Sequence, residues 1–217
     1  MEGVMGNLFD YNGKFVTTMS KVADSIILGL LWLVCSIPVI TIGASSSAFY
    51  YAYTKCIQQE QGGVWSAFFH GFKTGFKHAT VSWLALIVLG AVEIFDFFLL
   101  LSQGGASPIA TILLAIVVLF MIGIVLMALC LFPYIARYEN TWIESVKNCI
   151  LILFSNFFWV LLLLPILLVA VLSAISIPCM ILFAPSAYMF FANKILEHVF
   201  QKYMRREDLE AQQQYEP

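Results

Sequence analysis

Three long stretches without any charged residue limit what this chain can fold into. They cover residues 25–54, 97–136 and 148–193. A bilayer core of about 30 Å needs about 20 apolar helical residues to cross it. Each of the two longer stretches, 97–136 and 148–193, can therefore hold two crossings or one long tilted crossing. Of the 217 residues, 61% are hydrophobic and 11% charged, whereas about 25% are charged in a typical soluble domain. The sequence therefore predicts an all-α, polytopic helical membrane bundle.

Prolines and turn residues divide this apolar sequence into about six predicted transmembrane helices. These cover approximately residues 24–37, 42–57, 79–101, 108–136, 150–172 and 178–198. The first two are short, and a re-entrant hairpin formed by them would leave four full crossings. We expect a single membrane domain over residues 1–217, with a cytoplasmic N-terminal segment (1–21), a transmembrane bundle (22–200) and a cytoplasmic tail (201–217).

The basic residues predict the orientation. With six crossings, every lysine and arginine falls at a terminus or in a loop on one side of the membrane. They are Lys14, Lys21, Lys55, Lys73, Lys77, Arg137, Lys147, Lys194, Lys202, Arg205 and Arg206. Because basic loops stay in the cytoplasm, we expect a multi-pass protein of the cell membrane with both termini cytoplasmic.

Two segments on this basic side resemble elbow helices that lie along the membrane surface. In the first, aromatic residues recur every three or four positions between Trp65 and Phe76, while His70, Lys73 and Lys77 occupy another face. Aromatic and basic faces of this kind suit the headgroup region. The segment either binds a partner or an anionic lipid, or only positions the next helix. The second elbow begins at Thr141, which forms a capping-box pattern with Glu144.

Glu93 and Asp96 are the only charged residues between Lys77 and Arg137. Three positions apart, they share one helix face. Ionisable groups inside a membrane usually face a protein interior or a water-filled cavity, so this pair is a candidate functional site. Asp96 lies only five residues before the predicted helix end at Leu101, near the outer headgroups, where solvated carboxylates without a function are the alternative. Glu93 is one turn deeper and is harder to explain in that way.

The turn between the first two predicted helices has a packing pattern. Pro38 ends one helix, and Thr41 and Gly43 lead into the next. Gly43 and Ser47 then begin small-residue ridges at four-residue spacing. Such ridges allow close packing of membrane helices. Alternatively, Thr41 and the neighbouring serines line a polar path, as at the helix breaks of transporters.

Motifs of enzymes are missing from the sequence. No HExxH, GxSxG, phosphate-loop or dinucleotide motif is present. The five cysteines form no CxxC pair and have no histidine in metal-ligand spacing. We therefore expect no catalytic residues, no metal and no cofactor. The expected partner is the lipid bilayer, and no nucleic acid is expected.

Two blocks of sequence resemble one known family. The first is the run LWLVCSIPVITIGA over residues 31–44, followed by Ala48 and Tyr50, and the second is FFHGFKTGFKHAT over residues 68–80. These blocks resemble the YesL-like bacterial membrane proteins, although Gly75 and His78 stand where Asn and Gln are expected. The resemblance implies an integral membrane protein of undefined biochemical activity. Its members are often encoded beside sugar-uptake ABC transporters and polysaccharide-degrading enzymes.

Two functions from different classes follow. The first is a non-catalytic accessory or regulatory component of carbohydrate uptake, for which the resemblance implies ABC-type sugar transporter subunits as partners. The alternative is a permease or proton-coupled carrier in its own right, in which Glu93 and Asp96 titrate along the path. The sequence leaves the ligand and the oligomeric state open.

Overall fold

Helices form all the regular structure in the part of the chain that the computed structural model describes, which is residues 14–102, 108–138, 141–177 and 180–201. The elements in chain order are α2 (Lys14–Ser36), the 3₁₀ turn η1 (Val39–Thr41), α3 (Ile42–Ala52), the π-helical segment η2 (Tyr53–Gln58), α4 (Val64–Ser102), α5 (Pro108–Arg137), α6 (Trp142–Ser155), α7 (Phe157–Leu161), α8 (Leu163–Ser176) and α9 (Met180–Gln201). The predicted all-α class is confirmed. Most of the predicted N-terminal segment (1–21) and of the tail (201–217) lies outside the described residues.

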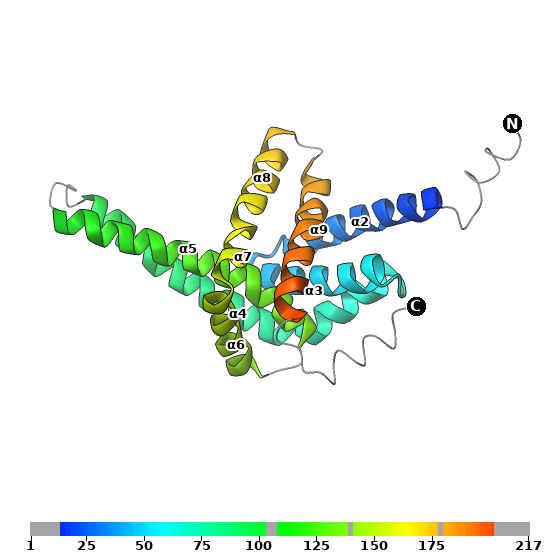
Figure 1. Cartoon of the computed structure of the whole chain (residues 1–217), viewed down its shortest axis with the longest axis horizontal. Helices are drawn as coiled ribbons and strands as arrows, with labels where there is room; N and C mark the ends of the chain where they lie inside the picture. The colour runs from blue at the N-terminus through cyan, green and yellow to red at the C-terminus, as the bar shows by residue number, and fades with distance from the viewer. Residues whose placement is uncertain (1–13, 103–107, 139–140, 178–179, 202–217) are drawn as a thin grey trace, which may run out of the picture.

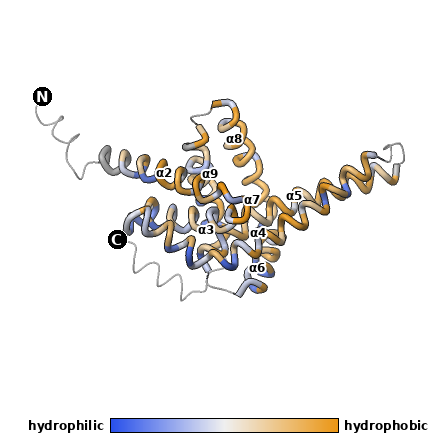
Figure 2. Tube along the Cα trace, turned by 180° about the vertical axis from the view of Figure 1, so that it is seen from behind, coloured by the Kyte–Doolittle hydropathy of each residue, from blue (hydrophilic) through white to orange (hydrophobic). Residues whose placement is uncertain are grey.

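Three helical arms diverge from a common centre (Figure 1). One arm is α2 with α3 beside it, the second is the hairpin of α4 and α5, and the third is the hairpin of α8 and α9. Figure 2 shows that the α4–α5 and α8–α9 hairpins are mainly hydrophobic, whereas hydrophilic residues occur along the outer half of α2 and gather around the end of α3, the start of α4 and α6. The core lies at the centre, where Phe49, Phe68, Leu131 and Leu196 are almost fully buried.

Helix α3 is the innermost element, since most of its residues are buried. It begins at a point of very close helix packing. A Cβ atom on Gly43 would lie 2.7 Å from the carbonyl oxygen of Ala79, 2.7 Å from Cβ of Trp83 and 2.9 Å from Phe132. Helices α4 and α5 therefore approach α3 as closely as a glycine permits. Small residues serve this purpose between membrane helices.

Four helices, and not six, are long and apolar enough to cross a membrane in the described part of the chain. They comprise Met19–Ser36, Val64–Ser102, Ile109–Arg137 and Phe157–Ser176, as expected of a multi-pass membrane protein. The predicted count of six is wrong at two places. Helix α3 has only 11 residues, and α9 is made less apolar by Asn193, Lys194 and Glu197. The absence of charge predicts a lipid-facing helix, whereas most residues of α3 are buried in protein.

The first elbow is also different from the prediction. Its residues are the beginning of α4, which continues without a break for 39 residues from Val64 to Ser102. The elbow and the third predicted transmembrane helix are therefore one helix. Gly71 and Gly75 do not interrupt it, because both face α3. A Cβ atom added to Gly71 would lie 3.0 Å from Tyr51, and one added to Gly75 would lie 3.2 Å from Ser47.

The second elbow is the separate helix α6, and it has the predicted capping box between Thr141 and Glu144. Hydrogen bonds from the Thr141 side chain and backbone lower the pKa of the Glu144 carboxyl. The chain then breaks at Asn156, whose φ of −126° and ψ of 37° are not helical. A second break at Leu162 places Pro165 in the first turn of α8, where a backbone N–H has no partner within the helix.

Candidate functional site

A buried ion pair lies where α3, α5 and α9 meet. Arg137, the last residue of α5, pairs with Glu197 of α9, and their side chains are only 11% and 15% exposed. The hydroxyl of Tyr50 donates a hydrogen bond of 3.1 Å to Oε1 of the same carboxylate. Removing one partner from a buried pair leaves an uncompensated charge, which is strongly unfavourable. The ion pair therefore joins α5 to α9, and the hydrogen bond from Tyr50 joins α3 to the same carboxylate.

Asn193, one helical turn before Glu197, extends this polar cluster to η2. Its amide nitrogen donates to Oε1 of Gln58 at 2.9 Å and lies 3.4 Å from Oγ1 of Thr54. Asn193 is 2% exposed. π-Helical turns are rare and frequently occur at functional sites. Here the π-helical segment is fastened to α9 by side-chain contacts.

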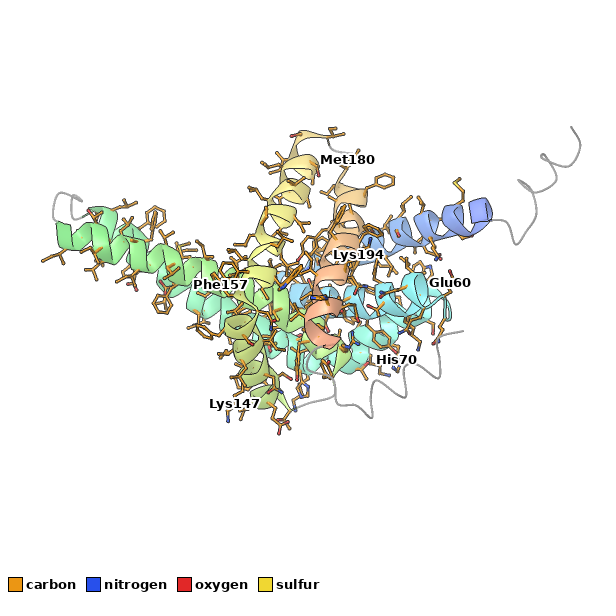
Figure 3. The ribbon with its side chains drawn as sticks, viewed as in Figure 1. Glu60, His70, Lys147, Phe157, Met180 and Lys194 are labelled. Carbon is orange, nitrogen blue, oxygen red and sulfur yellow. The ribbon has the colours of Figure 1, made fainter. Side chains whose placement is uncertain are left out.

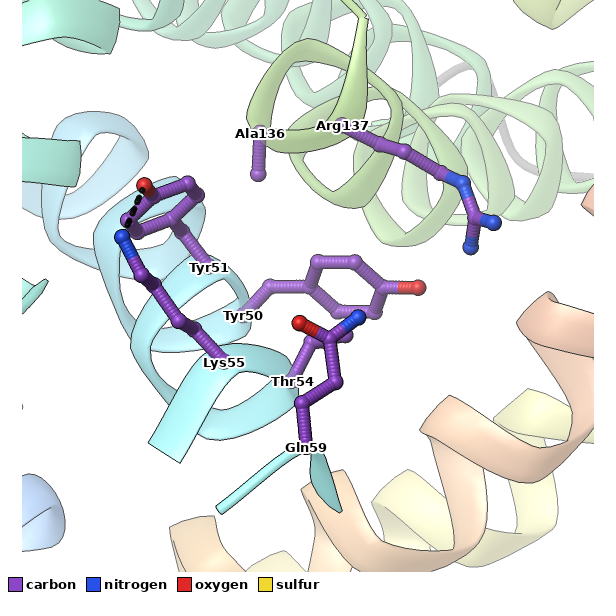
Figure 4. A pocket seen from close by; sticks show the side chains of 7 residues that line it. All are labelled: Tyr50, Tyr51, Thr54, Lys55, Gln59, Ala136 and Arg137. Atoms are coloured by element: carbon purple, nitrogen blue, oxygen red, sulfur yellow. Dashed lines mark hydrogen bonds between the residues drawn. The ribbon is translucent and has the colours of Figure 1, made fainter. Parts of the chain in front are cut away.

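An open pocket of about 250 Å³ borders this cluster on the side of η2. Its lining residues are Tyr50, Tyr51, Thr54, Lys55, Gln59, Ala136 and Arg137. In Figure 4, Tyr51 and Lys55 lie on one side, Arg137 lies on the other, and Tyr50 and Gln59 stand between them. The ammonium of Lys55 donates to the Tyr51 hydroxyl at 3.2 Å. The pocket therefore combines two cations with neutral hydrogen-bonding groups.

Glu93 and Asp96 lie elsewhere. Both belong to the part of α4 that forms the protruding hairpin with α5 (Figure 1). Glu93 is half-buried and Asp96 is exposed. Within the described residues, neither carboxylate has a hydrogen bond or an ion pair. The structure does not bring this predicted pair together with the buried polar cluster or with the pocket.

The turn around Pro38 is anchored by hydrogen bonds. The Thr41 hydroxyl lies 2.6 Å from the carbonyl oxygen of Cys35 and 2.8 Å from that of Pro38. The Trp83 indole donates to the Val39 carbonyl at 2.6 Å. Further along α3, Ser47 lies beside Gly75 of α4. These contacts fasten the α2–α3 turn to α4.

The predicted basic face of the first elbow lies on the exposed side of α4. Phe69, Phe72, Lys73 and Phe76 line a shallow groove of about 410 Å³. The ring of His70 packs at a tilt against Tyr51, with 5.7 Å between the centroids. Lys77 is also exposed. The aromatic side chains thus make an apolar surface with basic residues beside it.

The Arg137–Glu197 pair and its Tyr50 partner were missed by sequence reasoning. Arg137 is separated from Glu197 by 60 positions, and Tyr50 from Glu197 by 147, so no local spacing connects them. One signal was available. Glu197 lies four residues after Asn193 in α9, and polar residues at this spacing share one helix face.

The fold and this site define a multi-pass helical membrane protein with an internally paired polar centre. Residues 26–97 match the model of a family described as "Protein of unknown function, DUF624". The matched residues cover the C-terminal part of α2, all of α3 and η2, and most of α4. They contain Tyr50 and Lys55, whereas Arg137 and Glu197 lie outside them. No curated protein and no solved structure matches the chain.

Proposed function

We propose that the protein is a non-catalytic accessory or regulatory component of the cell membrane that assists carbohydrate uptake. The observation that supports this role is the pairing of the interior charges. Arg137, Glu197 and Tyr50 bond to one another, and so they hold α3, α5 and α9 in a fixed arrangement. A component that supports other subunits needs such a stable framework, whereas a carrier needs charges that can exchange partners.

The association with carbohydrate uptake rests on sequence resemblance. The blocks at residues 31–50 and 68–80 resemble the YesL-like proteins, which are often encoded beside sugar-uptake ABC transporters. The family match over residues 26–97 covers the same part of the chain. ABC-type transporter subunits are accordingly the proposed partners, and the bilayer is the proposed surroundings.

The proposed orientation places both termini in the cytoplasm. Lys21 near the start of α2 pairs with Glu60 just after η2 at 2.6 Å, so α3 and η2 return the chain to the side from which α2 began. Helix α9 returns beside α8 in the same way (Figure 1). Reporter fusions to each terminus, active only in the cytoplasm, test this orientation.

The placement of Glu93 and Asp96 favours the accessory role over the carrier hypothesis. Glu93 and Asp96 lie on the outer hairpin, away from the buried polar cluster. A proton-coupled carrier would require these carboxylates to face a path through the protein. The two functions can be distinguished by experiment, because an accessory acts only together with its partner subunits, whereas a carrier transports its substrate alone.

Crosslinking in native membranes, followed by affinity purification and mass spectrometry, tests the accessory role. An amine-reactive crosslinker suits the protein because its lysines lie on the proposed cytoplasmic side. We expect enrichment of ABC-type sugar transporter subunits over a tagged, unrelated polytopic protein. Sugar or proton flux in liposomes that contain this protein alone would contradict the accessory role. Flux that is lost in Glu93→Gln would establish the carrier instead.

A further inference from the structure

The pocket between η2 and the end of α5 has the chemistry of an anion site. Its lining presents hydrogen-bonding groups of five kinds, from phenol, hydroxyl, amide, ammonium and guanidinium side chains. They come from elements far apart in the sequence, since α3 and η2 supply one wall and α5 the other (Figure 4). A π-helical turn forms part of the wall, and such turns recur at functional sites.

The charges around the pocket do not balance. Arg137 is matched by Glu197. Lys55 is half-buried, and its ammonium contacts the hydroxyl of Tyr51 at 3.2 Å and lies 5.4 Å from that ring's centroid. Among the described residues, no carboxylate lies within ion-pair distance of Lys55. A partly buried cation is stabilised by an opposite charge nearby, so the pocket favours an anionic ligand.

The kinds of donor favour a phosphate over other anions. Lysine binds phosphate as a point charge, and Lys55 is the cation of this pocket that has no carboxylate partner among the described residues. Tyrosine, threonine and glutamine add neutral donors that suit the remaining oxygens. The position fits as well, because Arg137 ends the membrane-crossing segment Ile109–Arg137. Lipid phosphates lie at that depth, and basic pockets between helices bind lipid headgroups.

We propose that this pocket binds a phosphate group, held by Lys55 with Tyr51, Thr54 and Gln59 as neutral partners, while Arg137 stays paired with Glu197. The phosphate is either the phosphodiester of an anionic phospholipid headgroup or the phosphate of a soluble sugar phosphate. Both sources present the same oxygens to the same side chains. The proposal does not depend on a role in carbohydrate uptake.

Native mass spectrometry of the full chain in detergent micelles tests the site. The probes are phosphatidylglycerol and glucose 6-phosphate, the second as a competitor, and diacylglycerol is the comparison because it has the same acyl chains but no phosphate. The test variant is Lys55→Gln. The matched control is Lys147→Gln, because Lys147 is exposed on α6 and lies away from Glu60, which follows η2 (Figure 3).

We expect Lys55→Gln to weaken phosphatidylglycerol binding about tenfold and Lys147→Gln to change it less than twofold, with diacylglycerol binding unaffected by either. Displacement of the lipid by glucose 6-phosphate assigns the site to a soluble phosphate, and persistence of the lipid assigns it to a headgroup. The exposed Gln59 provides a second variant, Gln59→Ala, if Lys55→Gln does not fold. Equal effects of the pocket and control variants, or no binding of either phosphate probe, would overturn the proposal.

Discussion

Gly43→Ala is the substitution whose effect follows most directly from the structure. The added methyl group would lie 2.7 Å from the Ala79 carbonyl oxygen and from Cβ of Trp83, and 2.9 Å from Phe132. Ordinary contacts of this kind are about 3.5–4.0 Å. The carbonyl belongs to the backbone of α4 and cannot rotate away, so α3 and α4 must separate.

The size of the effect can be worked out from two terms. Overpacking of a close-packed core costs about 1–3 kcal/mol, and three contacts below 3.0 Å place Gly43 at the upper end. Replacing glycine by alanine in a helix raises the free energy of unfolding by about 1 kcal/mol. We therefore expect a net loss of about 2 kcal/mol in the free energy of unfolding.

Reversible unfolding in mixed detergent micelles, followed by tryptophan fluorescence, measures this loss. Gly90→Ala is the matched control, because nothing lies within 4 Å of a Cβ atom at that position and only the gain in helix propensity remains. Gly43→Ala must therefore be less stable than Gly90→Ala by about 3 kcal/mol, the net loss of about 2 plus the control's gain of about 1. If the two variants are equally stable, the close approach of α4 to α3 is refuted.

Three further predictions concern the charged residues. Arg137→Met should lower the free energy of unfolding by about 3 kcal/mol, because Glu197 stays buried and unpaired, and adding Glu197→Met should recover part of that loss in the same unfolding assay. Glu144 has a lowered pKa in its capping box, so wild-type protein should be more stable than Glu144→Gln above the ordinary pKa of 4.5. That advantage should vanish in a pH series as the pH falls through the lowered value. Glu93→Gln and Asp96→Asn should each change stability by less than about 0.5 kcal/mol, since neither carboxylate has a partner among the described residues; a larger loss by thermal unfolding contradicts that lack of partners.

Helix starts and breaks were predictable because local chemistry decides them. Pro38 follows the end of α2, Pro108 begins α5, and Thr141 caps α6, as their backbone constraints require. The number of crossings was not predictable in the same way. A stretch without charges occurs both in a lipid-facing helix and in a helix buried among others, and α3 is of the second kind.

The candidate site was predicted less well than the helices. Glu93 and Asp96 were selected because they lie inside a predicted membrane helix. That criterion considers each charged residue by itself and does not identify a partner for it. The paired residues Arg137 and Glu197 were unremarkable in sequence because each stands near a helix end, where charges are common. Only the arrangement of α5 and α9 makes their pairing visible.

The polar centre also shows why the family-matched segment depends on the rest of the chain. Within residues 26–97, Tyr50 has a hydroxyl that donates to Glu197, and Gln58 accepts from Asn193. Both partners lie on α9, the last described helix. Without α9, the buried hydroxyl of Tyr50 would have no acceptor there, which costs about 1–3 kcal/mol for a buried polar group. The arrangement of α3 and η2, and with it the pocket wall that holds Lys55, is therefore completed only when α9 packs beside them.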